Sequence, residues 1–280
     1  MTATTTLDFT PVTTVVGSIV EGVDITQPLA LEVEEQLHQA LRDRGVLFFQ
    51  NQALSNEQMD NFASYFGHPI PEPAIPNPAL DAAAVGQADL QPAKRATSVW
   101  HSDTTFVPQP PQATVLRAVE IPPVGGDTLW ASMYAAYEAL SAPMRDFLDG
   151  LTAIHTSEDM VRRSGIFTAD RSDALGQRDG AAVVHPVVRV HPVTGRKALF
   201  VNESSCTSIV ELTKAEGSHV LAILFEHVKS PDFMVRWKWT PNDVALWDNC
   251  AVQHYAVPDY TTTRIMQRVV TAGERPRGPR

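Results

Sequence analysis

Hydrophobic positions near the start of the chain follow a helical period and then change to a strand-like run. Apolar residues recur every three or four positions in residues 31–44, which predicts a helix that ends at Gly45. The continuous apolar run of residues 46–49 predicts a buried strand directly after it. Ser55 and Gln58 have the spacing of a capping box, so a second helix is expected to begin there.

After residue 111 the pattern changes to short alternating segments. Further strands are predicted at residues 112–120, 127–131, 183–191, 197–201, 232–239, 244–248 and 264–272. Helices are predicted at residues 132–149 and, after the capping box of Thr213 and Glu216, at residues 213–229. Many short strands separated by turn residues favour an antiparallel sandwich or barrel with flanking helices.

The segment between these two regions, residues 69–97, has no clear period. Five prolines fall within residues 69–78, and the rest of the segment is small and polar. Long irregular loops inside a domain are usually functional or mobile. We expect this segment to be a lid over a functional site, with a disordered insertion as the alternative.

Composition and charge exclude several classes of protein. The 280 residues carry 22 basic and 32 acidic side chains, and a net charge of −10 gives no basic surface for nucleic acid. With 44% hydrophobic and 19% charged residues the chain is a folded protein, which we expect to form a single domain over residues 1–280. No signal peptide and no apolar run near ~18 residues is present, which favours the cytoplasm and no membrane partner. Cys206 and Cys250 are expected to be packing residues.

The chain contains nine histidines, some of which could bind a metal. The one histidine with an acidic residue two positions later is His101, followed by Asp103, a pattern that this composition produces about once by chance. In a strand these two side chains would project to the same face, and His254 beside a later strand could add a third ligand. Two histidines and one carboxylate are typical of non-heme Fe(II) oxygenases, although zinc hydrolases use the same set. Structural or surface roles are expected for His155, His185 and His191.

The last predicted strand supplies candidate anion-binding residues. Alternation places Arg264 and Arg268 on one face. A guanidinium binds a carboxylate through two parallel hydrogen bonds, so two arginines near a metal could bind two different acids. The alternative is an edge strand with both arginines in solvent. Thr128 is a further polar candidate, or a strand-favouring residue without a special role.

Several motifs in chain order resemble one known family. They are VEGVDITQPL, RDRGVLFFQNQALSNEQ, WHSDTTF, GGDTLWASMYAAYEALS, HPVVRVHPVTGRKALFVN, WDN followed by QH, and RIMQR. These motifs are similar to those of the Fe(II)- and 2-oxoglutarate-dependent dioxygenases of the taurine dioxygenase family. The resemblance implies a mainly β fold with flanking helices, the double-stranded β-helix or cupin-like jelly roll. It also implies an oxygenase that uses Fe(II), 2-oxoglutarate and O2 and forms succinate and CO2.

The resemblance further implies roles for individual residues. The metal ligands would be His101, Asp103 and His254. The distal carboxylate of 2-oxoglutarate would be bound by Thr128 and Arg264. The primary substrate, a small organic anion, would be bound by Arg268, His68 and Thr97.

The identity of that anion is a separate question. The segments SMYAAYEALS, GRKALFVN and AVPDY look most like those of aryloxyalkanoate dioxygenases, and Gln267 stands where taurine and alkylsulfate enzymes usually have histidine. An aryloxyalkanoate is therefore favoured, with an alkyl sulfate, a sulfonate, or an amino or fatty acid as alternatives. Two alternatives belong to other functional classes: a jelly roll that binds an acid without catalysing a reaction, and a zinc hydrolase. The family resemblance also leads us to expect a homo-oligomer, a dimer or a tetramer.

Overall fold

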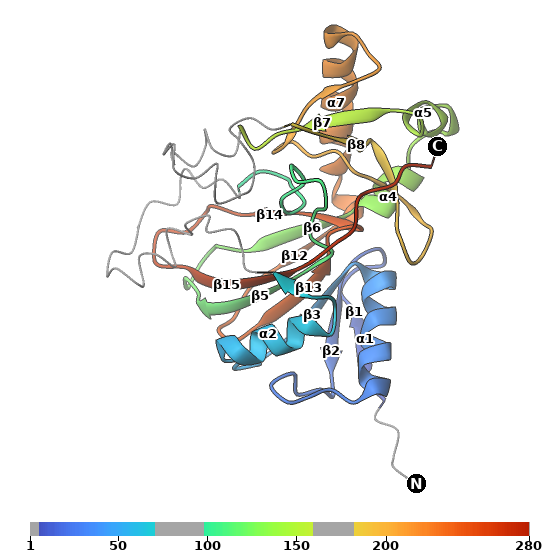
Figure 1. The fold of residues 1–280 in the computed structure, drawn as a ribbon. Coiled ribbons are helices and arrows are strands. Elements are labelled where there is room, and N and C mark those ends of the chain that lie inside the picture. The colour runs from blue at the N-terminus through green and yellow to red at the C-terminus, as the bar shows by residue number, and fades with distance from the viewer. Residues whose placement is uncertain (1–5, 71–97, 159–181, 280) are drawn as a thin grey trace.

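A large sheet forms the centre of the molecule (Figure 1). The computed structural model describes residues 6–70, 98–158 and 182–279. Within these residues the large sheet has seven strands in the order β1-β2-β3-β13-β5-β15-β4, and its one parallel pair is β2 with β3. The strands are β1 (Asp8–Pro11), β2 (Ser18–Glu21), β3 (Val46–Phe49), β4 (Pro69–Ile70), β5 (Ala113–Glu120), β13 (Val244–Asp248) and β15 (Ile265–Thr271).

Smaller antiparallel sheets complete the β structure of the described residues. The first is β12 (Met234–Trp237), β6 (Thr128–Ser132) and β14 (Val252–Ala256), in that order. The second is β11 (Cys206–Ile209), β7 (Thr152–His155) and β8 (Val183–Pro186). The third pairs β10 (Lys197–Leu199) with β9 (Val188–Val190). The chain is thus mainly β, as the sequence predicted.

Helices flank the sheets on two sides (Figure 1). They are α1 (Leu31–Arg44), α2 (Asn56–Ser64), α4 (Met133–Glu138), α5 (Ala142–Leu148) and α7 (Lys214–Val228), with a short 3-10 helix, η3 (Pro231–Phe233). The capping boxes predicted at Ser55 and Thr213 are both present, each with its backbone and side-chain hydrogen bond. None of the described helices is long and apolar enough to cross a membrane.

The central strands β3 and β13 are buried on both faces. Val46 and Phe48 of β3 belong to the apolar cluster shared with the sheet β12-β6-β14, where the Phe48 ring stacks on Trp237 with 4.1 Å between centroids. Leu47 and Phe49 point the other way, into a second cluster formed with α1 and α2. Successive strand residues alternate between faces, so one four-residue strand joins two cores.

Two elements that the sequence predicts as continuous are each divided in two. The single helix expected over residues 132–149 is two helices. α5 begins at Ala142, after its N-cap residue Ser141, and has Pro143 in its first turn, where the missing backbone N–H of proline costs no helical hydrogen bond. The single strand expected over residues 183–191 is two strands in different sheets, β8 and β9, separated at Val187. Pro186 ends β8, since proline cannot donate to a ladder.

Candidate metal centre

His101 and His254 meet across a backbone bridge. His254 lies in the middle of β14, and His101 pairs with it through two hydrogen bonds, N to O distances of 3.0 and 2.8 Å. Their ring centroids are 4.1 Å apart. Beyond His101 the chain turns, with Thr104 at a φ of 48°, so Asp103 reaches the imidazoles through a turn. The expectation that strand alternation brings His101 and Asp103 together was wrong, although the two side chains do converge.

The three side chains form a buried cluster. One ligand atom from each of His101, Asp103 and His254 lies within 4.8 Å of the others, and the residues are 9%, 2% and 6% exposed. His254 Nε2 is 3.7 Å from Asp103 Oδ1. The Nδ1 atom of His101 donates to the backbone oxygen of Val99 at 2.7 Å, which leaves its Nε2 lone pair for a ligand. The cluster has the composition of a facial triad.

Burial and charge set the protonation states of the cluster. Burial lowers the pKa of His101 and His254, so both imidazoles are neutral at neutral pH. Burial alone would raise the pKa of Asp103, but the positive charge of the Arg268 guanidinium and the hydrogen bond from Thr114 act against it, and the pKa is lowered to about 2. A divalent metal binds neutral imidazole and ionised carboxylate, so these residues fit such an ion.

A directed chain of hydrogen bonds ends on Asp103. Asn249 Oδ1 accepts from Trp247 Nε1 at 3.0 Å and from Asp103 N at 3.3 Å, so its Nδ2 faces Thr114. Nδ2 donates to Thr114 Oγ1 at 2.8 Å, and the Thr114 hydroxyl donates its proton to Asp103 Oδ2 at 2.8 Å. The bond from Thr114 engages Oδ2, while Oδ1 faces His254. Sequence reasoning missed Thr114 and Asn249, since alternation gives the face of a strand residue but not its partner across the core.

Arg268 lies directly beside the cluster. Its Nη1 donates to Asp103 Oδ1 at 2.7 Å, and its side chain is 26% exposed. The alternative that Arg268 points into solvent from an edge strand was wrong. Arg268 pairs with Leu116 of β5, the strand whose Thr114 also bonds Asp103, so two neighbouring strands direct polar side chains at this carboxylate. The position suits a guanidinium that receives an anionic group next to a metal.

Thr128 and Arg264 form a second polar pair. Arg264 is 9% exposed, and its Nη2 donates to Thr128 Oγ1 at 3.3 Å while its Nε donates to Gly126 O at 2.9 Å. Trp239 Nε1 also donates to Thr128 Oγ1, at 2.9 Å. Gly126 has a φ of 76°, and a Cβ there would lie 3.0 Å from Arg264 Cδ. The turn before β6 therefore needs glycine to let the guanidinium approach.

The remaining predicted site residues are not brought to this cluster by the described structure. His68 is exposed, and its backbone oxygen accepts from Ala272 N at 2.8 Å. Thr97 lies outside the described residues. The predicted lid, residues 69–97, also lies outside them except for its first two residues, which form β4. The lid stays a prediction.

A second cluster, His191 with Asp248 and Cys250, also has metal-ligand chemistry. However, His191 Nδ1 accepts from Val193 N and Thr194 N, so its proton is on Nε2 and is donated to Asp248 Oδ2 at 2.8 Å. No imidazole lone pair is left for an ion. The hydrogen bonds of His191 are all made within the protein interior. Cys206 and Cys250 are free and buried, consistent with packing residues. His155, His185 and His191 are buried too, and not surface residues.

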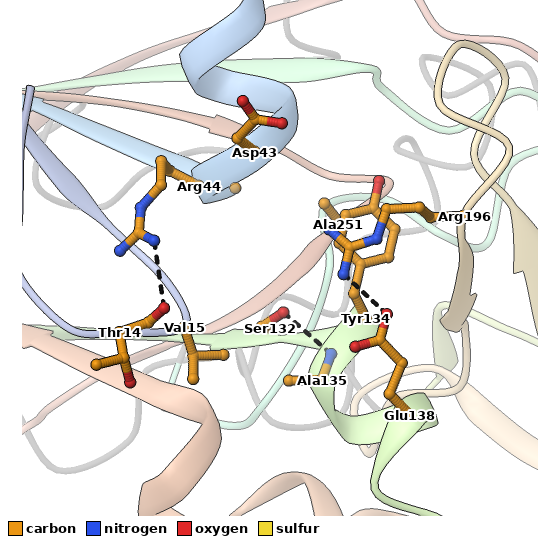
Figure 2. A pocket seen from close by; sticks show the side chains of 11 residues that line it. Thr14, Val15, Asp43, Arg44, Ser132, Tyr134, Ala135, Glu138, Arg196 and Ala251 are labelled. Atoms are coloured by element: carbon orange, nitrogen blue, oxygen red, sulfur yellow. Dashed lines mark hydrogen bonds and ion pairs between the residues drawn. The ribbon is translucent and has the colours of Figure 1, made fainter.

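A cavity of about 330 Å³ lies elsewhere, between α1 and α4 (Figure 2). Its arginines already have partners. Arg44 donates to Thr14 O at 3.3 Å, and Arg196 donates to Glu138 Oε1 at 2.8 Å. The metal cluster does not line this cavity.

Comparison with known proteins then decides the family. Residues 8–270 match the family described as taurine catabolism dioxygenase TauD, TfdA family. The chain belongs to this family. Membership confirms the predicted enzyme class and the predicted Fe(II), 2-oxoglutarate and O2, and it sets aside the zinc hydrolase and the non-enzymatic binding module.

Individual relatives have different named substrates. The chain is 37% identical over 288 residues to the alpha-ketoglutarate-dependent sulfate ester dioxygenase of Pseudomonas putida, covering 97% of this chain and 91% of that protein. It is 32% identical over 273 residues to the alpha-ketoglutarate-dependent 2,4-dichlorophenoxyacetate dioxygenase of Cupriavidus pinatubonensis, covering 90% and 93%. The crystal structure of a taurine dioxygenase from Burkholderia xenovorans matches with a TM-score of 0.80 and 35% identity, covering 98% and 93%. This likeness confirms the predicted jelly-roll fold.

Proposed function

We propose that this dioxygenase hydroxylates a small organic anion, with His101, Asp103 and His254 binding Fe(II). Thr128 and Arg264 bind the distal carboxylate of 2-oxoglutarate in this proposal. The bound iron and 2-oxoglutarate supply the oxidation by O2, with succinate and CO2 as products. The protein supplies position and charge.

The observation that carries the proposal is the place of Arg268. Its guanidinium lies 2.7 Å from a carboxylate oxygen of the metal cluster and stays partly exposed. A substrate anion bound there by paired hydrogen bonds would have its neighbouring carbon close to the metal. Arg264 contacts Thr128 and Gly126 whereas Arg268 contacts Asp103, so the two guanidinium groups hold separate positions, one proposed for each acid.

Side chains around the site also orient the residues that would bind the metal and 2-oxoglutarate. The neutral imidazoles present lone pairs, and the Thr114 hydroxyl orients the carboxylate of Asp103. Trp239 and Gly126 orient Thr128 and Arg264 before 2-oxoglutarate arrives. Such preorganisation lowers the entropic cost of assembling the reactants.

For the substrate class we place a sulfate ester first and an aryloxyalkanoate second. The support for the sulfate ester is the higher identity to the relative named for sulfate esters, 37% against 32% for the phenoxyacetate relative. The support for the aryloxyalkanoate is the similarity of the segments SMYAAYEALS, GRKALFVN and AVPDY to aryloxyalkanoate dioxygenases, together with the relative named for 2,4-dichlorophenoxyacetate. Hydroxylation beside the ester or ether oxygen would release sulfate or a phenol.

The test compares Arg268→Ala with Arg264→Ala, using succinate release in the presence of an alkyl sulfate, 2,4-dichlorophenoxyacetate or taurine. Arg268→Ala is expected to raise the KM for the primary substrate far more than the KM for the co-substrate, and Arg264→Ala to do the reverse. Arg268→Lys controls for charge without the guanidinium geometry. Equal effects of both alanine variants on both KM values would show that the two roles are wrongly divided.

Three broader proposals accompany this function. Residues 1–280 would act as one catalytic domain, with residues 69–97 as the lid. The two free, buried cysteines support a reducing compartment, the cytoplasm. The protein would form a homo-oligomer, a dimer or a tetramer, and light scattering would measure its mass in solution.

A further inference from the structure

A small basic cavity lies between β9 and the C-terminal segment. Its volume is about 80 Å³. It is lined by Arg189, Val190, Pro192, Glu274, Arg275 and Arg277. Three guanidinium groups and one carboxylate therefore surround a space that the metal cluster, Arg264 and Arg268 do not touch.

Arg189 has no anionic partner in the part of the chain that the structure describes. The residue is 3% exposed, and its Nε is buried without a hydrogen-bond partner. The contact of its guanidinium is with an aromatic face, 4.7 Å from the centroid of Phe200. A buried charge without a counter-ion is costly, so an anion beside Arg189 would relieve a real penalty.

The backbone brings the other two arginines to this place. Val190 N donates to Arg277 O at 2.8 Å, and these residues form an antiparallel bridge. The chain after β15 is thereby fixed along β9, with Arg275 and Arg277 exposed at the rim of the cavity. Their guanidinium groups are free to turn toward a ligand without loss of packing.

We propose that Arg189, Arg275 and Arg277 form a binding site for a small tetrahedral oxyanion, sulfate or phosphate. Three positive charges and the one negative charge of Glu274 leave two positive charges to match a dianion. Guanidinium groups bind the oxygens of such ions through paired hydrogen bonds. The cavity is far smaller than the roughly 300–1,000 Å³ of pockets for larger organic ligands, which limits the ligand to a small ion.

Glu274 is the internal competitor for this position. Its carboxylate is exposed and lines the same cavity, yet it forms no ion pair with Arg189 among the described residues. Glu274→Gln is therefore expected to strengthen oxyanion binding. An unchanged or weaker affinity in that variant would contradict the charge argument.

The experiment measures binding of sulfate, phosphate and acetate to the full chain by calorimetry at constant ionic strength. The test variant is Arg275→Gln with Arg277→Gln, both exposed and thus compatible with folding. Lys214→Gln with Lys238→Gln is the matched control, because it removes two exposed positive charges elsewhere. The arginine variant is expected to bind sulfate and phosphate about tenfold or more weakly, and the lysine variant to bind like the parent protein.

The position of the bound anion is tested with the Arg189 Nε–H resonance in nitrogen-15 NMR spectra. This resonance is identified by its absence from the spectrum of Arg189→Lys. A saturable shift with sulfate or phosphate, and none with acetate, supports the site. Sulfate also could bind at Arg268, so the shift must persist in Arg268→Gln. An unmoved Arg189 resonance, or equal affinities in the arginine and lysine variants, would overturn the proposal without touching the proposed catalytic function.

Discussion

Replacing Thr114 with valine tests whether the hydrogen-bond chain from Trp247 sets the metal affinity of Asp103. Valine keeps the shape of threonine but removes the hydroxyl that donates to Asp103 Oδ2. The site is fully buried, so water cannot replace the lost group. The Asp103 oxygen then loses its donor, and the Nδ2 of Asn249 loses its acceptor.

The size of the effect follows from these two losses. A hydrogen bond to a charged oxygen contributes roughly 1.5–3 kcal/mol, and an unpaired buried amide costs roughly 1–3 kcal/mol. Loss of a group that orients a metal ligand typically weakens metal binding about 10–100-fold, which is the change expected for Thr114→Val.

The assay is calorimetric titration of the metal-free protein with Mn(II), which avoids oxidation of Fe(II) during the measurement. Urea unfolding of the same metal-free samples separates metal affinity from a general loss of stability. Thr114→Ser is the matched control, because it keeps the hydroxyl, and it is expected to bind Mn(II) nearly as well as the parent protein. The reasoning is refuted if Thr114→Val binds Mn(II) like the parent, or if Thr114→Ser is as weak as Thr114→Val.

Three further predictions use other parts of the structure. Phe48→Ala should lower the free energy of unfolding by roughly 3–5 kcal/mol in urea, because its ring is fully buried, whereas exposed Val124→Ala should change it little. Gly126→Ala should raise the KM for the co-substrate 2-oxoglutarate more than the KM for the primary substrate, since its Cβ would displace Arg264; equal changes would argue against this. Burial lowers the pKa of His155 from 6.5 to about 3. Between these two pH values the imidazole is protonated in the unfolded chain and neutral in the folded chain. Stability should therefore fall below pH 6.5 by about 1.4 kcal/mol per pH unit for this group, and unfolding free energies that do not change with pH would contradict it.

The elements that sequence predicted best have a strong local signal. The helix of residues 31–44 and the strands of residues 46–49 and 244–248 have the predicted boundaries, because Gly45 ends the helix and continuous apolar runs mark the strands. The first and second strands, β1 and β2, were missed, since only four residues each pair there and burial is partial. Such strands depend on their neighbours more than on their own pattern.

For the metal cluster, the sequence predicted which residues take part but not the backbone conformation that brings them together. His101, Asp103 and His254 were named from spacing and motif, yet Asp103 arrives through a turn that no periodicity predicts. Thr114 and Arg189 look like ordinary strand residues until the fold places one against a carboxylate and the other against an aromatic ring. Their importance is a property of tertiary contacts.

The burial of β3 and β13 on both faces restricts where this scaffold can be redesigned. A strand with one solvent-facing side offers every second position for new contacts, but here every residue of these two strands is buried. New substrate preferences must therefore be engineered in the connecting segments and the rim around the metal cluster. The positions around Arg268 on β15 are where a mutant library should begin, with the central strands and the glycine turn at residues 122–126 left unchanged.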